Sequence, residues 1–326
     1  MILVTGGTGL VGAHLLCALV QEEKNIRAIY RSKSSINKTK QLFDNNHLSH
    51  LWNVIEWVEA DVTDVPQLTK AFEGITQIYH CAAMVSFQVK DFDTMSKINI
   101  EGTANMVNLA LDFGIEKFCH VSSIATLDEI NKTTQHFDET SEWNSNKKHS
   151  DYAITKNGGE IEVWRAIQEG LSAVIINPAV IFGEGFPNQG SGVIKKQIQK
   201  GMPFYTDGLM PIVMIDDVIK AMLFLMKNNH FRERFVLVSE NKPIQDVFSA
   251  FAKQLHKKPP HINIPKKAFH FAAIIDGILT VLIPNKKRSL THDLVQTSFS
   301  KDRYDSSKYL TLSTQSFQTL EQFLHL

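Results

Sequence analysis

A tyrosine and a lysine stand four positions apart in this sequence, a spacing that suits proton transfer. Tyr152 and Lys156 belong to the segment YAITK, which opens a stretch of helical periodicity that runs to about residue 169. Residues four apart share one face of a helix. A lysine cation stabilises a neighbouring phenolate, so we expect a lowered pKa for Tyr152. A phenol tuned in this way can exchange a proton with a carbonyl or carbinol oxygen.

A serine is placed to join this pair. Ser123 follows the predicted strand at residues 118–122, and its hydroxyl is suited to bonding the same substrate oxygen. The pattern YxxxK is common by chance, and the alternative interpretation is an exposed helix start. A strand that ends in VSS, together with a glycine-rich turn near the N-terminus, favours the catalytic interpretation.

That glycine-rich turn predicts a dinucleotide site. Residues 5–12 read TGGTGLVG, after an apolar strand at 1–4 and before a helix at 13–20. Gly6 allows the sharp turn, and Gly12 lets the helix pack closely on the strand. The pyrophosphate of NAD(P) then meets free N–H groups at a helix N-terminus. The predicted contacts in this turn are Gly6, Thr8, Gly9, Leu10, Val11 and Gly12.

The end of the second predicted strand bears on the choice of cofactor. In an NAD-binding unit an acidic residue near this point bonds the ribose 2′-hydroxyl. Here the strand at 26–30 is followed by Arg31, Ser32 and Lys33, with no carboxylate. Arg31 is suited to a 2′-phosphate, so we expect NADP(H) to be preferred, with NAD(H) as the alternative. A solvated basic loop is the other interpretation of these charges.

Further strands and helices alternate along the chain and predict a doubly wound parallel sheet in an α/β fold. Asp61, after the third strand, is placed to bond an adenine amino group. Ala82 and Ala83, after the fourth, are small enough to let the cofactor pass. The expected strands cover residues 54–58, 75–81, 118–122 and 173–177, and the expected helices between them cover residues 65–72 and 98–113.

Taken together, these motifs resemble the extended short-chain dehydrogenase/reductase family, the NAD(P)-dependent epimerase/dehydratase-like group, over nearly the whole chain. The matching segments are TGGTGLVG at 5–12, DV at 61–62, HCAA at 80–83, NIEGT at 99–103, VSS at 121–123, YAITK at 152–156, NPAVIFG at 177–183 and YDSSK at 304–308. In the family, the asparagine that Asn99 matches supports the site, and the lysine that Lys156 matches also holds the nicotinamide ribose.

The resemblance implies a catalytic set and a set of cofactor contacts. The implied catalytic residues are Ser123, Tyr152, Lys156 and Asn99. The implied cofactor contacts beyond the glycine turn are Arg31, Asp61, Val62, Ala82, Ala83, Tyr152, Lys156, Pro178 and Val180. No Cys/His cluster indicates a metal site.

The chain departs from the family's sugar-nucleotide branch at two places, and these departures narrow the class of reaction that we expect. Dehydratases of this family carry an acidic pair directly after the serine or threonine, where this chain has Ile124 and Ala125. Elimination of water is therefore disfavoured, because no carboxylate stands there. Asn177-Pro178 is also more similar to the dihydroflavonol-reductase and 3β-hydroxysteroid-dehydrogenase branch.

The substrate pocket is expected to be apolar and to suit an apolar or aromatic carbonyl compound. Residues 268–283 are apolar enough for a pocket lid or for a helix on a membrane surface, and too short for a span. Each pocket candidate has ordinary core packing as its alternative. The candidates are Met84, Ser86, Phe87, Phe182, Phe186 and Met214.

The resemblance also implies two domains. Residues 1–182 and about 211–239 would form the Rossmann domain, and about 183–210 and 240–326 a discontinuous substrate-binding domain. Residues 210–218 look like a strand that returns to the main sheet. A homodimer is possible by analogy with the family.

The composition of the chain limits the kinds of partner and the cellular location that we expect. Lys+Arg and Asp+Glu are both 34 among 326 residues, so the net charge favours neither nucleic acid nor an anionic membrane as a partner. No signal peptide or transmembrane span is predicted, so we expect a cytoplasmic protein. The scattered Cys17, Cys81 and Cys119 are expected to be small buried residues in a reducing compartment.

The sequence therefore predicts an NAD(P)-dependent oxidoreductase that moves a hydride between the nicotinamide and a carbonyl or secondary alcohol of a small molecule. Two alternatives stay open: a nucleotide-sugar epimerase that retains NAD, and a non-catalytic NADP-sensing protein. The direction of the reaction is left open as well.

Overall fold

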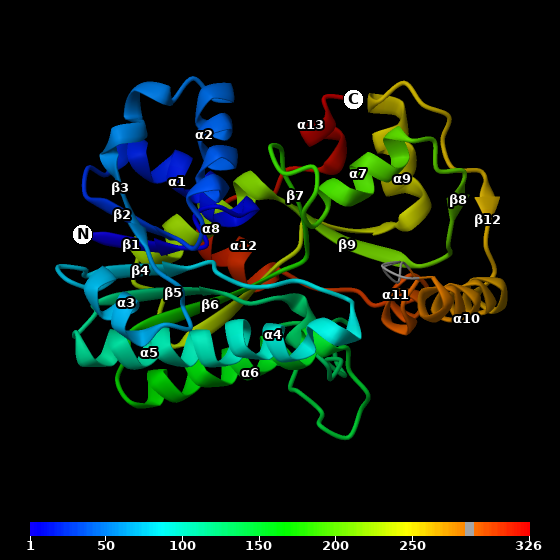
Figure 1. Cartoon of the computed structure of the whole chain (residues 1–326). Helices are drawn as coiled ribbons and strands as arrows, with labels where there is room; N and C mark the ends of the chain where they lie inside the picture. The colour runs from blue at the N-terminus through cyan, green and yellow to red at the C-terminus, as the bar shows by residue number, and fades with distance from the viewer. Residues whose placement is uncertain (284–289) are drawn as a thin grey trace.

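The computed structural model describes residues 1–283 and 290–326, arranged as two lobes (Figure 1). The larger lobe is built on a seven-stranded sheet, and the smaller lobe carries a three-stranded and a two-stranded sheet. Among the described residues, no helix is both long and apolar enough to cross a bilayer.

The seven-stranded sheet is parallel throughout, in the order β10-β6-β5-β4-β1-β2-β3. The predicted doubly wound α/β fold is confirmed. Strand order reverses between β1 and β4, the place where open sheets of this kind bind ligands. The strands are β1 (Ile2–Thr5), β2 (Ile26–Tyr30), β3 (Ile55–Glu59), β4 (Gln77–His80), β5 (Lys117–Val121), β6 (Ala173–Pro178) and β10 (Glu233–Leu237).

Helices cover both faces of this sheet (Figure 1). One face carries α1 (Leu10–Glu22), α2 (Ile36–Asn45) and α8 (Ile215–Lys227). The other carries α3 (Val65–Ala71), α4 (Phe92–Ser96), α5 (Gly102–Asp112) and α6 (Asp151–Gln168). Parallel strands covered on both faces are apolar along their length, and β6 is buried at every position.

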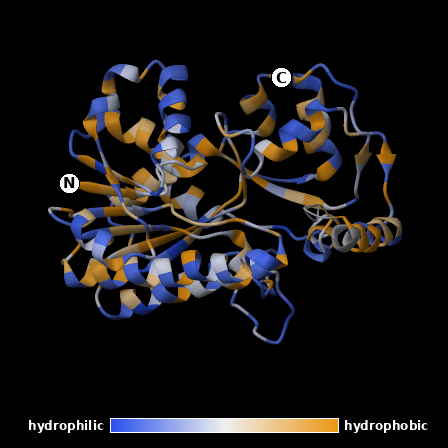
Figure 2. Cartoon of the chain, viewed as in Figure 1, coloured by the Kyte–Doolittle hydropathy of each residue, from blue (hydrophilic) through white to orange (hydrophobic). Residues whose placement is uncertain are grey.

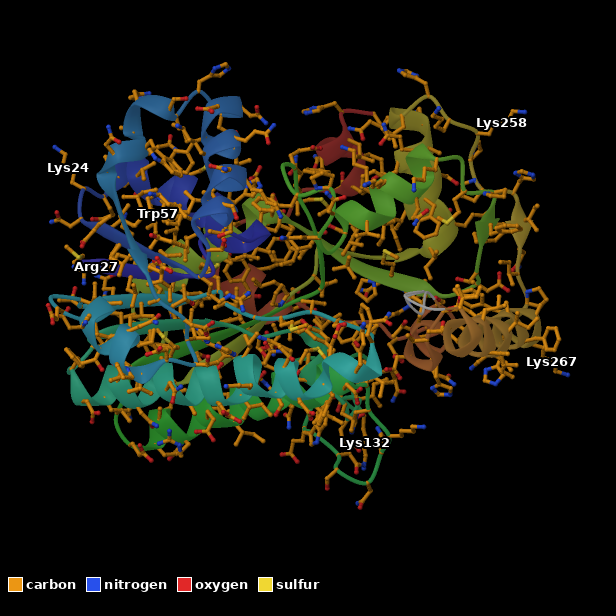
Figure 3. The ribbon with its side chains drawn as sticks, in the orientation of Figure 1. Lys24, Arg27, Trp57, Lys132, Lys258 and Lys267 are labelled. Carbon is orange, nitrogen blue, oxygen red and sulfur yellow. The ribbon has the colours of Figure 1, made fainter. Side chains whose placement is uncertain are left out.

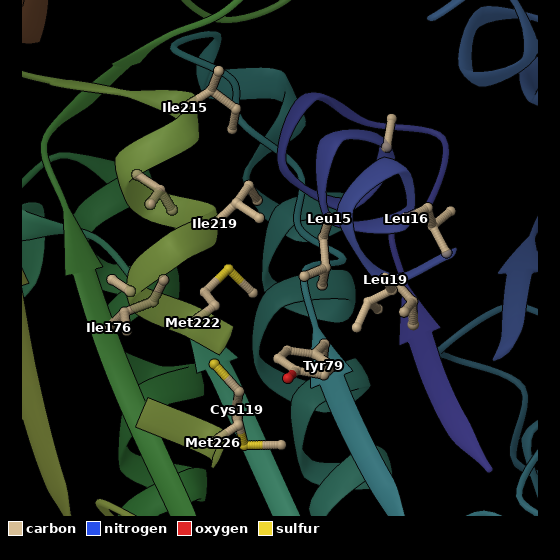
Figure 4. Close-up of a cluster of buried hydrophobic side chains, with 14 of the residues drawn as sticks. Leu15, Leu16, Leu19, Tyr79, Cys119, Ile176, Ile215, Ile219, Met222 and Met226 are labelled. Atoms are coloured by element: carbon tan, nitrogen blue, oxygen red, sulfur yellow. The ribbon is translucent and has the colours of Figure 1, made fainter. Parts of the chain in front are cut away.

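The two faces of the sheet make two separate cores, because successive side chains of a strand point in opposite directions. Ile2 and Val4 of β1 join the core under α1 and α8, whereas Leu3 joins the core under α5 and α6. Figure 4 shows the first core, where leucines of α1 face Ile219 and Met222 of α8 above Tyr79 of β4.

The smaller lobe contains a sheet of order β11-β9-β7 and a two-stranded sheet of β12 and β8. Its strands are β7 (Val180–Phe182), β8 (Phe204–Tyr205), β9 (Leu209–Met214), β11 (Glu240–Pro243) and β12 (Ile262–Asn263). The remaining helices are α7 (Gly192–Gln199), α9 (Ile244–Gln254), α10 (Lys266–Leu282), α11 (His292–Thr297), α12 (Ser307–Ser313) and α13 (Leu320–Leu324).

One predicted strand lies in a different sheet from the one expected. Residues 210–218 were expected to return to the main sheet, but β9 pairs with β7 and, antiparallel, with β11. The return is made by α8 and β10 instead. An apolar run predicts a buried strand and does not say which sheet receives it, since that depends on long-range pairing. The division into two domains stays a prediction.

Candidate cofactor and active site

The turn between β1 and α1 has no room for side chains at two of its glycines. Gly6 has a φ of +68°, and a Cβ there would lie 2.7 Å from the backbone of Cys81 and Ala82. A Cβ on Gly12 would lie 2.3 Å from the carbonyl oxygen of Gly6. The turn therefore packs against the end of β4 and against its own helix, which leaves the backbone bare on the ligand side.

The N-terminus of α1 is suited to an anion. Its N-cap residue is Gly9, which offers no side-chain acceptor, and the first turn carries no acidic residue. The N–H groups of a first helical turn have no partner within the helix. In α1 these belong to Leu10, Val11 and Gly12, so the pyrophosphate of NAD(P) fits a place where donors converge.

A buried chain of hydrogen bonds ties this turn to the end of β4. The Thr5 hydroxyl accepts the N–H of Ala82 at 3.1 Å and lies 2.7 Å from Nδ1 of His80. Nε2 of His80 lies 3.0 Å from the Thr103 hydroxyl, which itself donates to the Asn99 carbonyl at 2.7 Å. Thr103 has one proton to give, so Nε2–H of His80 donates to it and Thr5 donates to Nδ1.

His80 stays neutral in this chain, because burial lowers its pKa to about 3. The sequence placed His80 in the HCAA motif without giving it a role. The structure shows it bridging β1, β4 and α5 in the interior.

Asn99 fixes the loop after β4 to the catalytic helix. It lies in a π-helical turn, Lys97–Glu101, a distortion often found at functional sites. Its side chain accepts from the N–H of Met84 at 2.8 Å and donates to the Met84 carbonyl at 2.9 Å. It also donates to the Thr155 hydroxyl at 3.1 Å. These contacts position neighbouring segments.

The structure brings Ser123, Tyr152 and Lys156 together at the carboxyl end of β5. Helix α6 begins there, capped by the Ser150 side chain, so Tyr152 and Lys156 stand in its first two turns. The Ser123 side chain hydrogen-bonds to Tyr152. The Lys156 ammonium donates to the carbonyl of Val121, the last residue of β5, at 2.7 Å.

The protonation states differ from the sequence expectation. Burial raises the pKa of Tyr152 above its ordinary value, and the hydrogen bond from Ser123 opposes this only in part. The expected lowering of this pKa by Lys156 was wrong, because desolvation disfavours the phenolate and the lowering contribution comes from Ser123. Burial also lowers the pKa of Lys156 to about 8, against the raising effect of the Glu160 carboxylate. At neutral pH the pair is a neutral phenol beside a mostly charged ammonium.

Glu160, one turn beyond Lys156, was missed by sequence reasoning. One oxygen of its buried carboxylate accepts hydrogen bonds from Ser122 at 2.6 Å, Thr126 at 2.9 Å and Asn177 at 2.9 Å. These donors stand at the ends of β5 and β6 and in the 3₁₀ turn Ile124–Thr126. Because Asn177 also donates to the Ser123 carbonyl at 3.1 Å, the carboxylate fixes the backbone that carries the serine.

The second oxygen of the Glu160 carboxylate accepts hydrogen bonds from a different pair of residues. It accepts from the guanidinium of Arg234 on β10 at 3.1 Å and from the indole of Trp164 at 3.3 Å. The signal in the sequence was a glutamate four residues after Lys156, on the same helix face. Its donors come from elements distant in sequence, so the network itself was not predictable.

The residues expected near the adenosine lie at the ends of β2 and β3. Arg31 is exposed just after β2. The Asp61 carboxylate accepts from the N–H and hydroxyl of Thr63 at 2.9 and 2.8 Å, and the carbonyl of Val62 accepts from Asn105 at 3.0 Å. Pro178 ends β6 and Val180 starts β7, where the chain crosses between the lobes.

The expected pocket residues divide into two groups. The Phe87 ring is 49% exposed and 6.3 Å from the Tyr152 ring, and Met84 is half-buried nearby in the chain. Ser86 donates to the Asp91 carboxylate at 2.6 Å. The other candidates are buried in hydrophobic cores, and their place in the pocket stays a prediction. These are Phe182, Phe186 and Met214.

Comparison with known proteins identifies the family. The model of the NAD dependent epimerase/dehydratase family matches residues 2–237. A Synechocystis protein assigned as a dihydroflavonol 4-reductase is 27% identical over 312 residues, which cover 94% of this chain and 87% of that protein. Sterol demethylase protein B of Methylococcus capsulatus is 25% identical, over 94% of this chain and 90% of that protein.

Solved structures agree on the fold. The crystal structure of gox2253 superposes with a TM-score of 0.81 at 25% identity, over 99% of this chain and 95% of that chain. UDP-glucose 4-epimerase of Thermotoga maritima superposes with a TM-score of 0.73 at 18% identity, over 99% of this chain and 96% of that chain. At that identity the second likeness shows the fold alone.

The glycine turn predicts different outcomes for two substitutions. Gly12→Ala puts a methyl group 2.3 Å from the Gly6 carbonyl, so we expect a loss of about 1–3 kcal/mol of stability together with weaker NADPH binding. Gly9→Ala has its nearest contact at 3.4 Å, so we expect unchanged stability and weaker NADPH binding only. Denaturant unfolding and fluorescence titration measure both. Equal stability of the two variants would contradict the packing described for the turn.

The Glu160 network predicts a shifted pH profile. Glu160→Gln removes the charge that raises the pKa of Lys156, so the loss of activity at alkaline pH, expected near the wild-type Lys156 pKa of about 8, should move to lower pH. Leaving Arg234 without its carboxylate should also cost about 2–3 kcal/mol of stability.

The matched control is Glu162→Gln on the same helix, which loses only a surface pair with Arg165. We expect it to alter neither the profile nor the free energy of unfolding. Profiles of kcat/KM against pH that coincide for Glu160→Gln and wild type would refute the role given to this carboxylate.

Proposed function

The chain belongs to the NAD dependent epimerase/dehydratase family, and from this premise we propose that it is a reductase of an apolar or aromatic carbonyl compound that prefers NADPH. That it is an NAD(P)-dependent oxidoreductase of the extended short-chain dehydrogenase/reductase type follows from the family and its relatives. The observation that carries the proposal is the meeting of Ser123, Tyr152 and Lys156 beside the glycine turn of a parallel sheet.

In this proposal Tyr152 is the proton donor. When bound, the nicotinamide supplies a hydride to the substrate carbonyl carbon. The Tyr152 phenol, neutral because burial raises its pKa, gives its proton to the carbonyl oxygen. Ser123 shares a hydrogen bond with that phenol and is suited to holding the same oxygen. Oxidation of the alcohol uses the same groups in reverse.

Lys156 has two functions in the proposal. Its ammonium stabilises the phenolate that remains after the proton has left, and it holds the nicotinamide ribose as the family's lysine does. The hydrogen bond to the Val121 carbonyl anchors the ammonium at the end of β5. The Glu160 carboxylate raises the pKa of this ammonium. Asn99 acts on this site by positioning α6 and the loop after β4.

The proposed cofactor contacts follow the sheet's carboxyl edge. The glycine turn and the first turn of α1 would hold the pyrophosphate, as their bare backbone and free donors support. Arg31 would pair with a 2′-phosphate, and Asp61 and Val62 would border the adenine. The remaining contacts proposed for the nicotinamide half are Ala82, Ala83, Tyr152, Lys156, Pro178 and Val180.

The surroundings of Tyr152 support an apolar substrate. Phe87 presents a half-exposed ring beside the Tyr152 ring. Ile124 and Ala125 follow Ser123, so the chain has no carboxylate for elimination at that point. Two relatives are named for reactions of a sterol and of a dihydroflavonol, which are polycyclic molecules. A homodimer through α5 and α6 stays a proposal by analogy.

Replacement of Tyr152 tests the proton donor. Tyr152→Phe removes only the hydroxyl, so we expect kcat for NADPH-dependent reduction of a ketone to fall by about 10²–10⁴-fold while NADPH binding changes little. Tyr205→Phe on β8 is the control and should keep full activity. The measurement is loss of NADPH absorbance with a panel of aromatic and alicyclic ketones.

Three outcomes would contradict the reductase proposal or its assigned proton donor. Retained turnover in Tyr152→Phe would remove the assigned donor. NAD(H) that copurifies with the chain, with UDP-sugar conversion and no net use of cofactor, would indicate an epimerase. NADPH binding without turnover of any carbonyl or alcohol would indicate a sensing protein.

Arg31 decides the cofactor preference in the proposal. Arg31→Ser should weaken NADPH binding about tenfold or more and leave NADH binding unchanged, because one charge-assisted contact to a phosphate is worth about 1.5–3 kcal/mol. Lys24→Ser, at the other end of β2 (Figure 3), is the charge-matched control. Equal losses for NADPH and NADH would contradict a 2′-phosphate contact.

A further inference from the structure

Helix α10 exposes one apolar side. Phe271 is 65% exposed and Ile278 55% exposed, and three neighbours complete what we call the α10 face. At 3.6 residues per turn these positions share one side of the helix. The α10 face consists of Phe271, Ile274, Ile275, Ile278 and Leu279. Figure 2 shows the mostly apolar colour of α10 at the edge of the molecule.

The opposite side of α10 holds the helix to the protein. Ala273 is buried, and the Phe269 ring lies 6.0 Å from the Phe299 ring. The Asp276 carboxylate accepts from the N–H of Leu290 at 2.8 Å. Because the opposite side of α10 already packs against the protein, the α10 face is not the side by which this helix joins a core. Exposed apolar patches of this kind mark interaction sites.

Two exposed lysines, Lys266 and Lys267, begin the helix that carries the α10 face. Residues 257–283 contain Lys257, Lys258, Lys266 and Lys267 and a single acidic residue, Asp276, although the whole chain carries 34 residues of each sign. Lys267 stands one turn before Phe271 on the same helix side. In Figure 3, Lys267 projects from the end of the smaller lobe that carries α10, whereas Lys258 lies at the opposite end of that lobe.

We propose that the α10 face docks on an anionic lipid surface, with the apolar side chains in the interface and the lysines at the phosphate groups. An amphipathic helix with Lys beside its apolar side and Phe and Ile on it lies flat in the headgroup region in this way. The helix would bind peripherally, since no described helix can span a bilayer.

The charges favour a lipid surface over a second copy of the chain. In an isologous contact each copy presents the same patch, so the lysines around one α10 face would approach those of the other. Like charges at such a contact are unfavourable. Anionic headgroups complement both the charge and the apolar side chains, each lysine near the surface contributing to the attraction.

A second apolar pair lies directly before the helix. Ile262 of β12 and Phe204 of β8 are register partners, and both are exposed. β12 runs into α10 at the same end of the smaller lobe (Figure 1). Docking through this end needs neither cofactor nor catalysis, so it can be tested separately from the proposed reductase.

The test is co-sedimentation of the full chain with extruded vesicles. We expect at least tenfold stronger partitioning into phosphatidylcholine–phosphatidylglycerol vesicles at a ratio of about 7:3 than into pure phosphatidylcholine, and loss of this difference at high salt. Ile275→Glu should weaken partitioning about tenfold. Val65→Glu on α3 is the matched control, because Val65 is 42% exposed and Ile275 is 41% exposed.

Lys267→Glu should also weaken binding to the anionic vesicles, whereas Lys132→Glu, which changes a lysine on a distant loop (Figure 3), should not. Thermal unfolding by circular dichroism identifies any variant that fails to fold, and Ile278→Glu then replaces Ile275→Glu.

Four results would overturn the proposal. The wild type could fail to bind the anionic vesicles at low salt, or Val65→Glu could weaken binding as much as Ile275→Glu. A change from dimer to monomer in Ile275→Glu, with vesicle binding intact, would make the α10 face a contact between copies. Reduced ketone turnover in Ile275→Glu, with vesicle binding intact, would make the α10 face a pocket lid.

Discussion

The site depends on a buried carboxylate that the protein itself must solvate. Removing a charge from water is costly unless hydrogen bonds and an opposite charge replace the lost hydration. Glu160 meets this demand with donors from β5, β6, β10 and its own helix. Satisfying one charge therefore fixes the relative positions of the elements that carry Ser123 and Lys156, which is the geometry the proposed chemistry needs.

Buried hydrogen bonds also connect the rest of the site. The parallel sheet gathers the carboxyl ends of β1, β4, β5 and β6 on one edge. His80 then joins the glycine turn to α5, and Asn99 joins the loop after β4 to α6. The titratable groups around Lys156 are Glu160 on its own helix, Cys81 after β4, and the neutral His80 and His120 on the neighbouring strands. Burial lowers the pKa of the ammonium, and the Glu160 carboxylate raises it.

Local patterns predicted much of this structure. TGGTGLVG after a strand identified the turn, because sterics at Gly6 and Gly12 are set by nearby residues, and the i, i+4 spacing put Tyr152 and Lys156 on one helix face. What failed depended on contacts distant in sequence. β9 joined the second sheet, and the Glu160 donors came from other elements. The pKa of Tyr152 lies above its ordinary value because of burial, which the sequence does not show.

We infer that the site holds a neutral Tyr152 phenol together with a Lys156 ammonium whose pKa the Glu160 carboxylate raises. The most direct test is a ¹³C NMR titration of ζ-carbon-labelled tyrosine, with the Tyr152 signal assigned by its loss in Tyr152→Phe. The account predicts that this signal stays at its phenol position up to about pH 9, since burial holds the pKa of Tyr152 above its usual value near 10. A change to the phenolate position between about pH 7 and 8 would contradict it.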